Sequence, residues 1–429
     1  MKTSIWLVAL AAAMLTASAL LRAGQLSETF RRWLDHPAIK YASTPSTDPV
    51  AQLSRRIQDG SVQLESNGPS GYLRSVLAAL NVPIESQIAV FVPDSVQAPR
   101  IRRDNPRTLF FTDNVAVGWV RGGFIEFAAQ DRRQGVIFYA LEQTLFGFGK
   151  PQITRRDDCL TCHYNYSTVG VPGAVVRSSG QFAVDHRLGL EDRWGGWYVT
   201  GTHGSNRHLG NVNIEQLFTR TPQADTASNW SSFDGKFDWS GYLTPYSDIV
   251  AHLVFDHQMH MMNLLTRIGW EARVTEYEQR LAKTKSAVSS LTDEAERPIS
   301  IAAAAKEVVD YLLFIDEAPL VDTIQGSTGF ATTFEAKGPR DRNGRSLRQF
   351  DLTKRLFRYP CSYMIYSDVF SALPAAAKAA IYDRMWAVLS GQDHSARYAR
   401  LSQQDRLAVI QILTETKDDL PSSFRSSVR

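Results

Sequence analysis

The residues best suited to chemistry are Cys159, Cys162 and His163, which form a C-x-x-C-H sequence in the middle of the chain. Two thiols at this spacing can each add across one vinyl group of the same haem, and the adjacent histidine can turn its imidazole onto the iron. The motif therefore predicts one covalently attached haem c. We expect thioether links at Cys159 and Cys162, and His163 as the proximal axial ligand of the iron.

Two other chemistries use cysteine pairs of this kind. A thioredoxin-like redox pair lies between a strand and a helix of a compact alternating α/β unit, and no such unit is expected around Cys159. A zinc site needs further ligands, and Cys361 is the only cysteine left of the three in the chain. Cys361 itself is expected to be a buried thiol that packs as a small apolar side chain.

At this motif the chain resembles the single-haem c-type cytochromes. The resemblance covers Cys159 to His163 and implies the two thioether links, the proximal histidine and redox chemistry at the iron. Small soluble cytochromes c carry the motif near the start and supply a methionine some tens of residues later. Here the motif follows a long stretch of other structure, and the first methionine after it is Met259. Two further phrases, RWGGWYVTGTHG at 193–204 and RYPCSY at 358–363, are similar to those of larger exported haem proteins, a resemblance that implies no particular activity.

The first residues predict export. Residues 1–3 give a positively charged start, residues 5–15 are an unbroken apolar run, and residues 17–19 offer the small side chains that a signal peptidase requires. We therefore expect residues 1–23 to be a signal peptide, with an uncleaved membrane anchor as the alternative. Export places the folded chain in the periplasm, where haem is attached covalently, and contact with the membrane is expected only if the leader is retained.

Composition favours a globular chain that does not bind nucleic acid. The 429 residues are 44% hydrophobic and 21% charged, and 47 lysines and arginines stand against 44 acidic residues. No run of basic residues alternates with aromatic ones, as a nucleic-acid groove would require. The expected partner is instead a redox protein or a small-molecule redox substrate.

The hydrophobic pattern predicts an α+β fold, with an antiparallel β-rich N-terminal half and a helical C-terminal half. We divide the chain into a β-rich region (24–150), a haem-attachment and loop region (151–245) and a helical region (246–429), with the haem at the junction. Runs rich in β-branched and aromatic residues predict strands over 88–92, 108–112, 115–120, 124–128 and 136–141, and further strands over 181–184 and 197–200. A period of about 3.6 predicts helices over 248–283, 300–314, 374–390 and 402–417.

The helix expected over 248–283 carries most candidates for the sixth iron position. A rotation of about 100° per residue places His257 near the centre of an apolar stripe, pointing inward, and His260 at its edge. His203 is the rival, because a glycine on each side of the Thr202-His203 pair lets the backbone approach a flat cofactor. We rank His257 first, His203 second and His260 third, and place the methionines below them: Met259, Met261 and Met262.

Aromatic and cationic side chains around His203 are candidates for secondary contacts. Trp194, Trp197 and Tyr198 can stack along the porphyrin, and Arg193 or Arg207 can neutralise its propionates. Ordinary core packing or a surface ion pair explains each of these side chains equally well.

Two functions from different classes stay open. In the first, the haem passes single electrons between exported redox partners. In the second, it catalyses peroxidase-like or other small-molecule redox chemistry at an open sixth position, with a histidine and an arginine handling protons and charge. The segment 317–348, rich in glycine and charge, is expected to be a lid-like connection that favours catalysis. A separate metal site built from Asp256, His257 and His260 is a third possibility. Weighing these, the sequence places electron transfer first.

Overall fold

The computed structural model describes residues 33–143, 150–179, 182–212, 229–284 and 300–426. The expected leader, residues 1–23, lies outside these ranges. Within them, no helix has both the length and the apolar character needed to cross a membrane.

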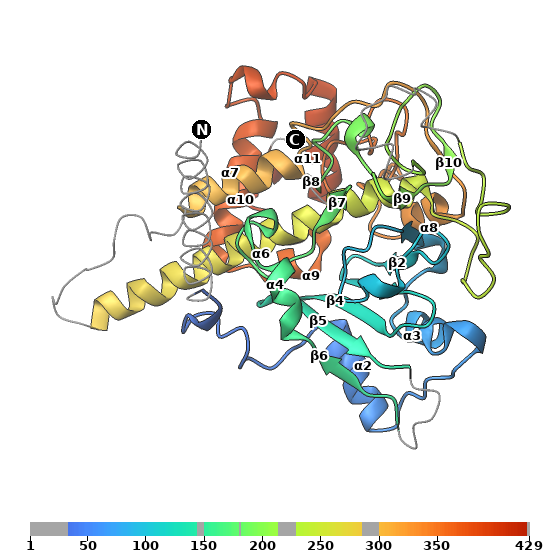
Figure 1. Cartoon of the computed structure of the whole chain (residues 1–429). Coiled ribbons are helices and arrows are strands. Elements are labelled where there is room, and N and C mark those ends of the chain that lie inside the picture. The colour runs from blue at the N-terminus through green and yellow to red at the C-terminus, as the bar shows by residue number, and fades with distance from the viewer. Residues whose placement is uncertain (1–32, 144–149, 180–181, 213–228, 285–299, 427–429) are drawn as a thin grey trace, which may run out of the picture.

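A seven-stranded antiparallel sheet dominates the N-terminal half and confirms the α+β prediction (Figure 1). The five strands expected between residues 86 and 143 are all present. The strand expected over 197–200 is present as β9 at one edge of the sheet, and β6, which was not expected, forms the other edge. The order across the sheet is β6, β5, β4, β3, β2, β1, β9. The strands span β1 Ile88–Val90, β2 Arg107–Phe111, β3 Val115–Trp119, β4 Ile125–Asp131, β5 Gly135–Leu141, β6 Ile153–Arg155 and β9 Trp197–Tyr198.

Both faces of this sheet are covered, and successive side chains alternate between two cores. Along β5, Ile137 and Tyr139 face a core that includes α2 (Pro49–Gln58) and α3 (Leu73–Ala79). Val136 and Phe138 face the opposite core, which includes the long helix α6 (Ile249–Thr284). Helices α2 and α3 were not expected in this region, which the sequence predicts to be β-rich.

Helix α6 lies between the sheet and the remaining helices (Figure 1). It begins at Asp248, whose carboxylate accepts hydrogen bonds from the backbone N–H groups of Val250 and Ala251. The other expected helices are also present, as α7 Ile301–Leu312, α10 Ala375–Leu389 and α11 Gln403–Thr416. Three short helices complete the helical half: α8 Phe330–Ala336, α9 Asp368–Ser371 and α12 Ser422–Ser426.

The first 24 residues of α6 are buried on nearly every side, rather than along one stripe. His257 is fully buried, as its inward position predicts. His252 and Met259, which lie on other sides of the helix than His257, are buried as well. A helix enclosed by a sheet on one side and helices on the other has no solvent face, so periodicity cannot rank its side chains.

The segment 317–348 is not the extended lid that its composition suggests. It contains α8, and the side chains of Ile324, Phe330 and Phe334 are buried in the same core as α6. Its short strand β11 (Gln325–Gly326) pairs with β10 (Gly201–Thr202). Some of its charged residues are exposed, among them Lys337, Arg340 and Arg342, whereas Glu317, Asp341 and Arg348 are buried, so composition alone does not show which parts of the segment are packed.

The C-x-x-C-H motif lies between the sheet and α6. A single 3-10 turn, η4 (Asp157–Cys159), follows β6 and leads directly into the one-turn helix α4 (Leu160–His163). The hairpin of β7 (Val176–Ser178) and β8 (Phe182–Val184) then passes along α6. The motif therefore lies at the junction of the β-rich and helical halves.

Candidate haem-binding site

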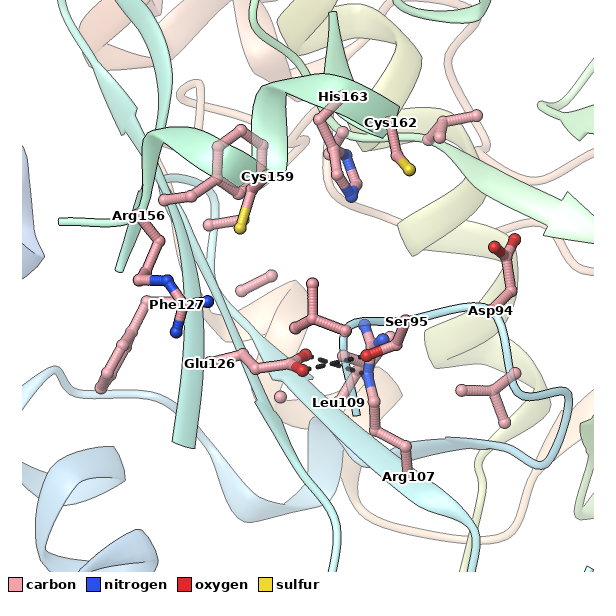
Figure 2. A pocket seen from close by; sticks show the side chains of 18 of the residues that line it. Asp94, Ser95, Arg107, Leu109, Glu126, Phe127, Arg156, Cys159, Cys162 and His163 are labelled. Carbon is pink, nitrogen blue, oxygen red and sulfur yellow. Dashed lines mark hydrogen bonds and ion pairs between the residues drawn. The ribbon is translucent and has the colours of Figure 1, made fainter. Parts of the chain in front are cut away.

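A cavity of about 410 Å³ separates the motif from one face of the sheet. This volume falls within the range of roughly 300–1,000 Å³ that is typical of cofactor and small-molecule sites. Cys159, Cys162 and His163 all line the cavity, and Figure 2 shows their side chains pointing into it from one short helical segment. Much of the remaining wall is apolar: Val90, Leu109, Ala116, Phe138, Ala174, Trp197, Phe255 and Met259.

The local fold places the three motif side chains on one side. Residues three and four apart in a helical segment share a face, so Cys159, Cys162 and His163 point the same way. The helix ends directly after His163, where the Asn165 side-chain amide donates a hydrogen bond of 2.7 Å to the carbonyl oxygen of Cys162. Both cysteines are free thiols. Burial, with the nearby Asp158 carboxylate, raises the pKa of the Cys159 thiol to about 11.

The imidazole of His163 is held by the backbone of Gly173. Its Nδ1 lies 3.0 Å from the carbonyl oxygen of Gly173, and the Gly173 N–H donates back to the carbonyl oxygen of His163 at 3.0 Å. A carbonyl can only accept, so Nδ1 carries the proton and Nε2 keeps its lone pair. Burial lowers the pKa of His163, which favours the neutral ring that binds metals.

Helix α6 fixes the position of Gly173 in turn. The Asn263 side chain accepts a hydrogen bond from the Ala174 N–H at 3.1 Å and donates one of 2.7 Å to the Ala174 carbonyl. A Cβ added at Gly173 would lie 2.2 Å from Asn263 Oδ1, so only glycine fits between the histidine and the helix. Neither Gly173 nor Asn263 was singled out from the sequence, because each acts through a contact between distant segments.

The wall that faces His163 is polar (Figure 2). Arg107 Nε on β2 lies 3.3 Å from Glu126 Oε2 on β4, while Ser95 and Gln97 both donate to Glu126 Oε1, at 3.0 and 2.9 Å. Gly118 on the intervening strand leaves room for this pair, because a Cβ there would lie 3.0 Å from Glu126 Oε2. The sequence analysis missed this group, since its members come from three separate segments.

Three arginines line the cavity, and each is paired with a carboxylate that also lines it. The pairs are Arg107–Glu126, Arg156–Asp158 at 2.8 Å and Arg177–Asp94 at 3.6 Å. Guanidinium groups at a cavity wall suit the carboxylates of haem propionates.

The arginines proposed from the sequence for this role lie elsewhere. Arg193 donates to the carbonyl oxygen of Leu188 and approaches Asp256 Oδ2 at 3.5 Å, and Arg207 is exposed and outside the cavity lining. Of the three proposed aromatic residues, Trp197 lines the cavity and Trp194 and Tyr198 do not.

None of the three histidines proposed as the sixth ligand lines the cavity. His257 Nδ1 lies 2.7 Å from His186 Nδ1, and His257 Nε2 lies 2.7 Å from Ser362 Oγ. His203 Nδ1 is bonded to the carbonyl oxygen of Asn206, and His260 Nε2 lies 3.1 Å from Arg187 Nη2.

Among the methionines ranked below the histidines, Met259 lines the cavity, one helical turn after Phe255. The rank order from the sequence relied on the apolar stripe of α6. In the structure, the sheet and β7 pack against sides of this helix that lie outside the apolar stripe. This is why Met259, and not His257, faces the cavity.

The alternative metal site does not form as proposed. Asp256 accepts a hydrogen bond of 2.9 Å from the indole N–H of Trp194, and its neighbour His257 is engaged by His186 and Ser362. Among the residues that the structure describes, no three histidine, cysteine, aspartate or glutamate side chains gather into a metal-ion site. Cys361 is fully buried, as expected, and burial raises its pKa to about 12.

These residues fit a covalently attached haem. Two free thiols and a neutral imidazole with an available Nε2 face an apolar cavity of suitable size, and arginines stand at its wall. Comparisons of the chain with protein-family models, with curated proteins and with solved structures each give no match. The residues of this site are therefore the basis for inferring a function.

Proposed function

We propose that this chain is an exported c-type haem protein with a redox function. The observation that carries the proposal is the convergence of Cys159, Cys162 and His163 on one cavity lined by apolar side chains. A haem bound there supplies an iron that alternates between ferric and ferrous states. Export, which covalent attachment requires, is supported by the sequence of residues 1–23.

The chain's own residues have separate tasks in this proposal. Cys159 and Cys162 would tether the group, and His163 would bind the iron through Nε2, with Gly173 keeping the ring in the required tautomer. Arg156 and Arg177, which line the cavity, would hold the propionates. The apolar lining from the sheet and α6 would keep water away from the bound group, which strengthens charge interactions inside the cavity.

The polar wall facing His163 favours an enzyme over a simple electron carrier. A carrier keeps two strong axial ligands, whereas an enzyme leaves the sixth position open beside groups that move protons and stabilise charge. Glu126 and Arg107 are groups of this kind, and all three histidine candidates are engaged elsewhere. We therefore place a haem-c oxidoreductase of peroxidase-like type ahead of the carrier.

Electron transfer between exported redox partners remains the second candidate because of Met259. This thioether lines the cavity, and a methionine opposite a histidine is the ligand pair of many electron-transferring cytochromes c. The identity of the sixth ligand separates the two functions.

The attachment is tested by producing the full chain together with a haem maturation system. Intact-mass spectrometry is expected to show one added haem, retained on a denaturing gel stained for haem. The double variant Cys159→Ala/Cys162→Ala should lose this haem. Cys361→Ala is the matched control, since this cysteine lies outside the cavity, and it should retain the haem. A colourless wild-type protein with no added mass would refute the proposal.

A further inference from the structure

Glu126 and Arg107 form an ion pair at the cavity wall in which not every hydrogen-bonding group has a partner in the part of the chain that the structure describes. The two side chains are 17% and 19% exposed. Ser95 and Gln97 both donate to Glu126 Oε1, while Oε2 has the Arg107 guanidinium at 3.3 Å. The Arg107 Nε–H is buried and lacks a hydrogen bond within the described residues, because the ion pair is not aligned for one. A carboxylate and a guanidinium thus lie side by side on the wall that faces His163.

The charge of the cavity disfavours an anionic substrate. Each of the three arginines that line it is matched by a carboxylate, so the lining carries no net charge from these six side chains. Two haem propionates would make the occupied site negative. A negative site repels nitrite and other anions, and leaves small neutral molecules unaffected.

We infer that Glu126 is a catalytic acid-base residue and that the substrate is a small neutral hydroperoxide, with hydrogen peroxide as the simplest member. This inference rests on the proposed haem function. Hydrogen peroxide both donates and accepts hydrogen bonds, and so complements the Glu126 carboxylate, which accepts, and the Arg107 guanidinium, which donates, at the cavity wall.

The proposed step moves one proton within the substrate by way of Glu126. Oε2 accepts the proton of the oxygen nearer to His163 and returns it to the far oxygen as the O–O bond breaks. Arg107 stabilises the negative charge that develops on the departing oxygen, which leaves as water. The oxygen nearer to His163 is released as the second water after two electrons and two protons have arrived, so that one hydrogen peroxide, two protons and two electrons give two waters. An exported one-electron donor protein supplies the electrons in two steps, and solvent supplies the protons.

Cyanide binding tests the role of Glu126 without turnover. At neutral pH the probe enters as HCN, which, like hydrogen peroxide, must lose a proton when it binds ferric iron. Stopped-flow absorbance is expected to show that Glu126→Gln slows cyanide association by about 10²-fold, the usual size of a lost acid-base group. Carbon monoxide has no proton to lose, so its association with the ferrous protein should be unchanged. Glu415→Gln is the matched control, because Glu415 is a carboxylate that is 19% exposed, paired with an arginine and outside the cavity lining, and this variant should bind both probes as the wild type does.

Several outcomes would overturn the inference. Cyanide association at the wild-type rate in Glu126→Gln would do so, as would an equal loss of carbon monoxide binding. Binding of nitrite as rapid as that of cyanide would remove the argument for a neutral substrate. A wild-type protein that carries one haem by mass but binds neither probe has a filled sixth position, which refutes this inference and leaves the haem proposal intact. If Glu126→Gln fails to fold, Glu126→Asp keeps the charge on a shorter side chain and should show an intermediate cyanide rate.

Discussion

The Nδ1 atom of His163 lies 3.0 Å from the carbonyl oxygen of Gly173, and the amide of Gly173 closes a second hydrogen bond to the backbone of His163. The ring that is expected to bind iron is thus oriented by one residue ten positions later in the chain. Asn263 of α6 holds the neighbouring residue Ala174 through two hydrogen bonds to its backbone, and this fixes the position of Gly173. The helical half of the molecule therefore controls the geometry of a motif attached to the sheet.

We expect Asn263→Ala to destabilise the fold without removing the haem. The substitution leaves a buried N–H and C=O of Ala174 unsatisfied, at a cost of about 1–3 kcal/mol for each such group. Denaturant unfolding measures the loss, and the haem stain should be unchanged. Asn343→Ala, at an exposed asparagine, is the control and should cost less than about 0.5 kcal/mol. An Asn263→Ala protein as stable as the wild type would show that Gly173 is held by other contacts.

Met259→Leu distinguishes the two candidate functions. The swap nearly conserves side-chain volume and should cost less than about 1.5 kcal/mol in stability. If the sixth position is open, the ferric protein is high-spin and its electron paramagnetic spectrum is the same in the variant. Loss of a low-spin signal on substitution would identify Met259 as the ligand and favour the electron carrier. His257→Ala, which changes a residue outside the cavity lining, should leave the spin state unaltered.

The arginines at the cavity wall should tune the reduction potential. A nearby positive charge favours the reduced iron, so Arg177→Gln should lower the potential. The expected shift is about 10–40 mV, because a partly exposed charge pair is worth roughly 0.2–1 kcal/mol and 59 mV corresponds to a tenfold change for one electron. Potentiometric titration measures it. Arg207→Gln, at an exposed arginine outside the cavity, should have little effect, and an equal shift in both variants would contradict the assignment.

The buried histidines predict a loss of stability in acid. Burial lowers the pKa of five of them, to about 3 for His208, His252 and His257, to about 4 for His260 and well below the usual value for His186. The unfolded chain takes up their protons below about pH 6.5 and the folded chain does not, so stability falls as the pH drops from about 6.5 towards these values. Burial also raises the pKa of Asp256 and Glu317 to about 7. These two carboxyl groups increase stability as the pH falls below about 7, but they are fewer than the five histidines.

His208→Asn isolates one of these histidines. His208 Nδ1 accepts a hydrogen bond from the Gly210 N–H, and the asparagine oxygen can accept it in the same way without titrating. The difference in unfolding free energy between about pH 6.5 and about pH 5 should shrink by about 2 kcal/mol in this variant. His394→Gln, at an exposed histidine, should leave the difference unchanged. An undiminished difference in His208→Asn would show that this histidine is already protonated in the folded protein.

The sequence predicts what local patterns determine. The strands around Phe110, Val117 and Ile137 and the span of α6 agree with the structure within a few residues, because alternation and helical capping are local properties. The motif from Cys159 to His163 is also predictable from the sequence, because its three side chains lie on one short segment.

The rest of the candidate site depends on contacts between distant segments. Glu126 and Arg107 meet because β2 and β4 flank Gly118 on β3, and a single sequence shows none of this register. The ranking of His257 over Met259 relied on a helix with one buried face, whereas the first 24 residues of α6 are buried on nearly every side. Local patterns therefore predict the candidate attachment motif but not the side chains that face it across the cavity.

Cys162 is exposed to solvent on a single helical turn, while α6 and the sheet beneath it are packed without it. In the proposed haem protein, the group bound through this thiol would have one edge at the molecular surface. A donor protein would then deliver its electrons at that edge without entering the fold.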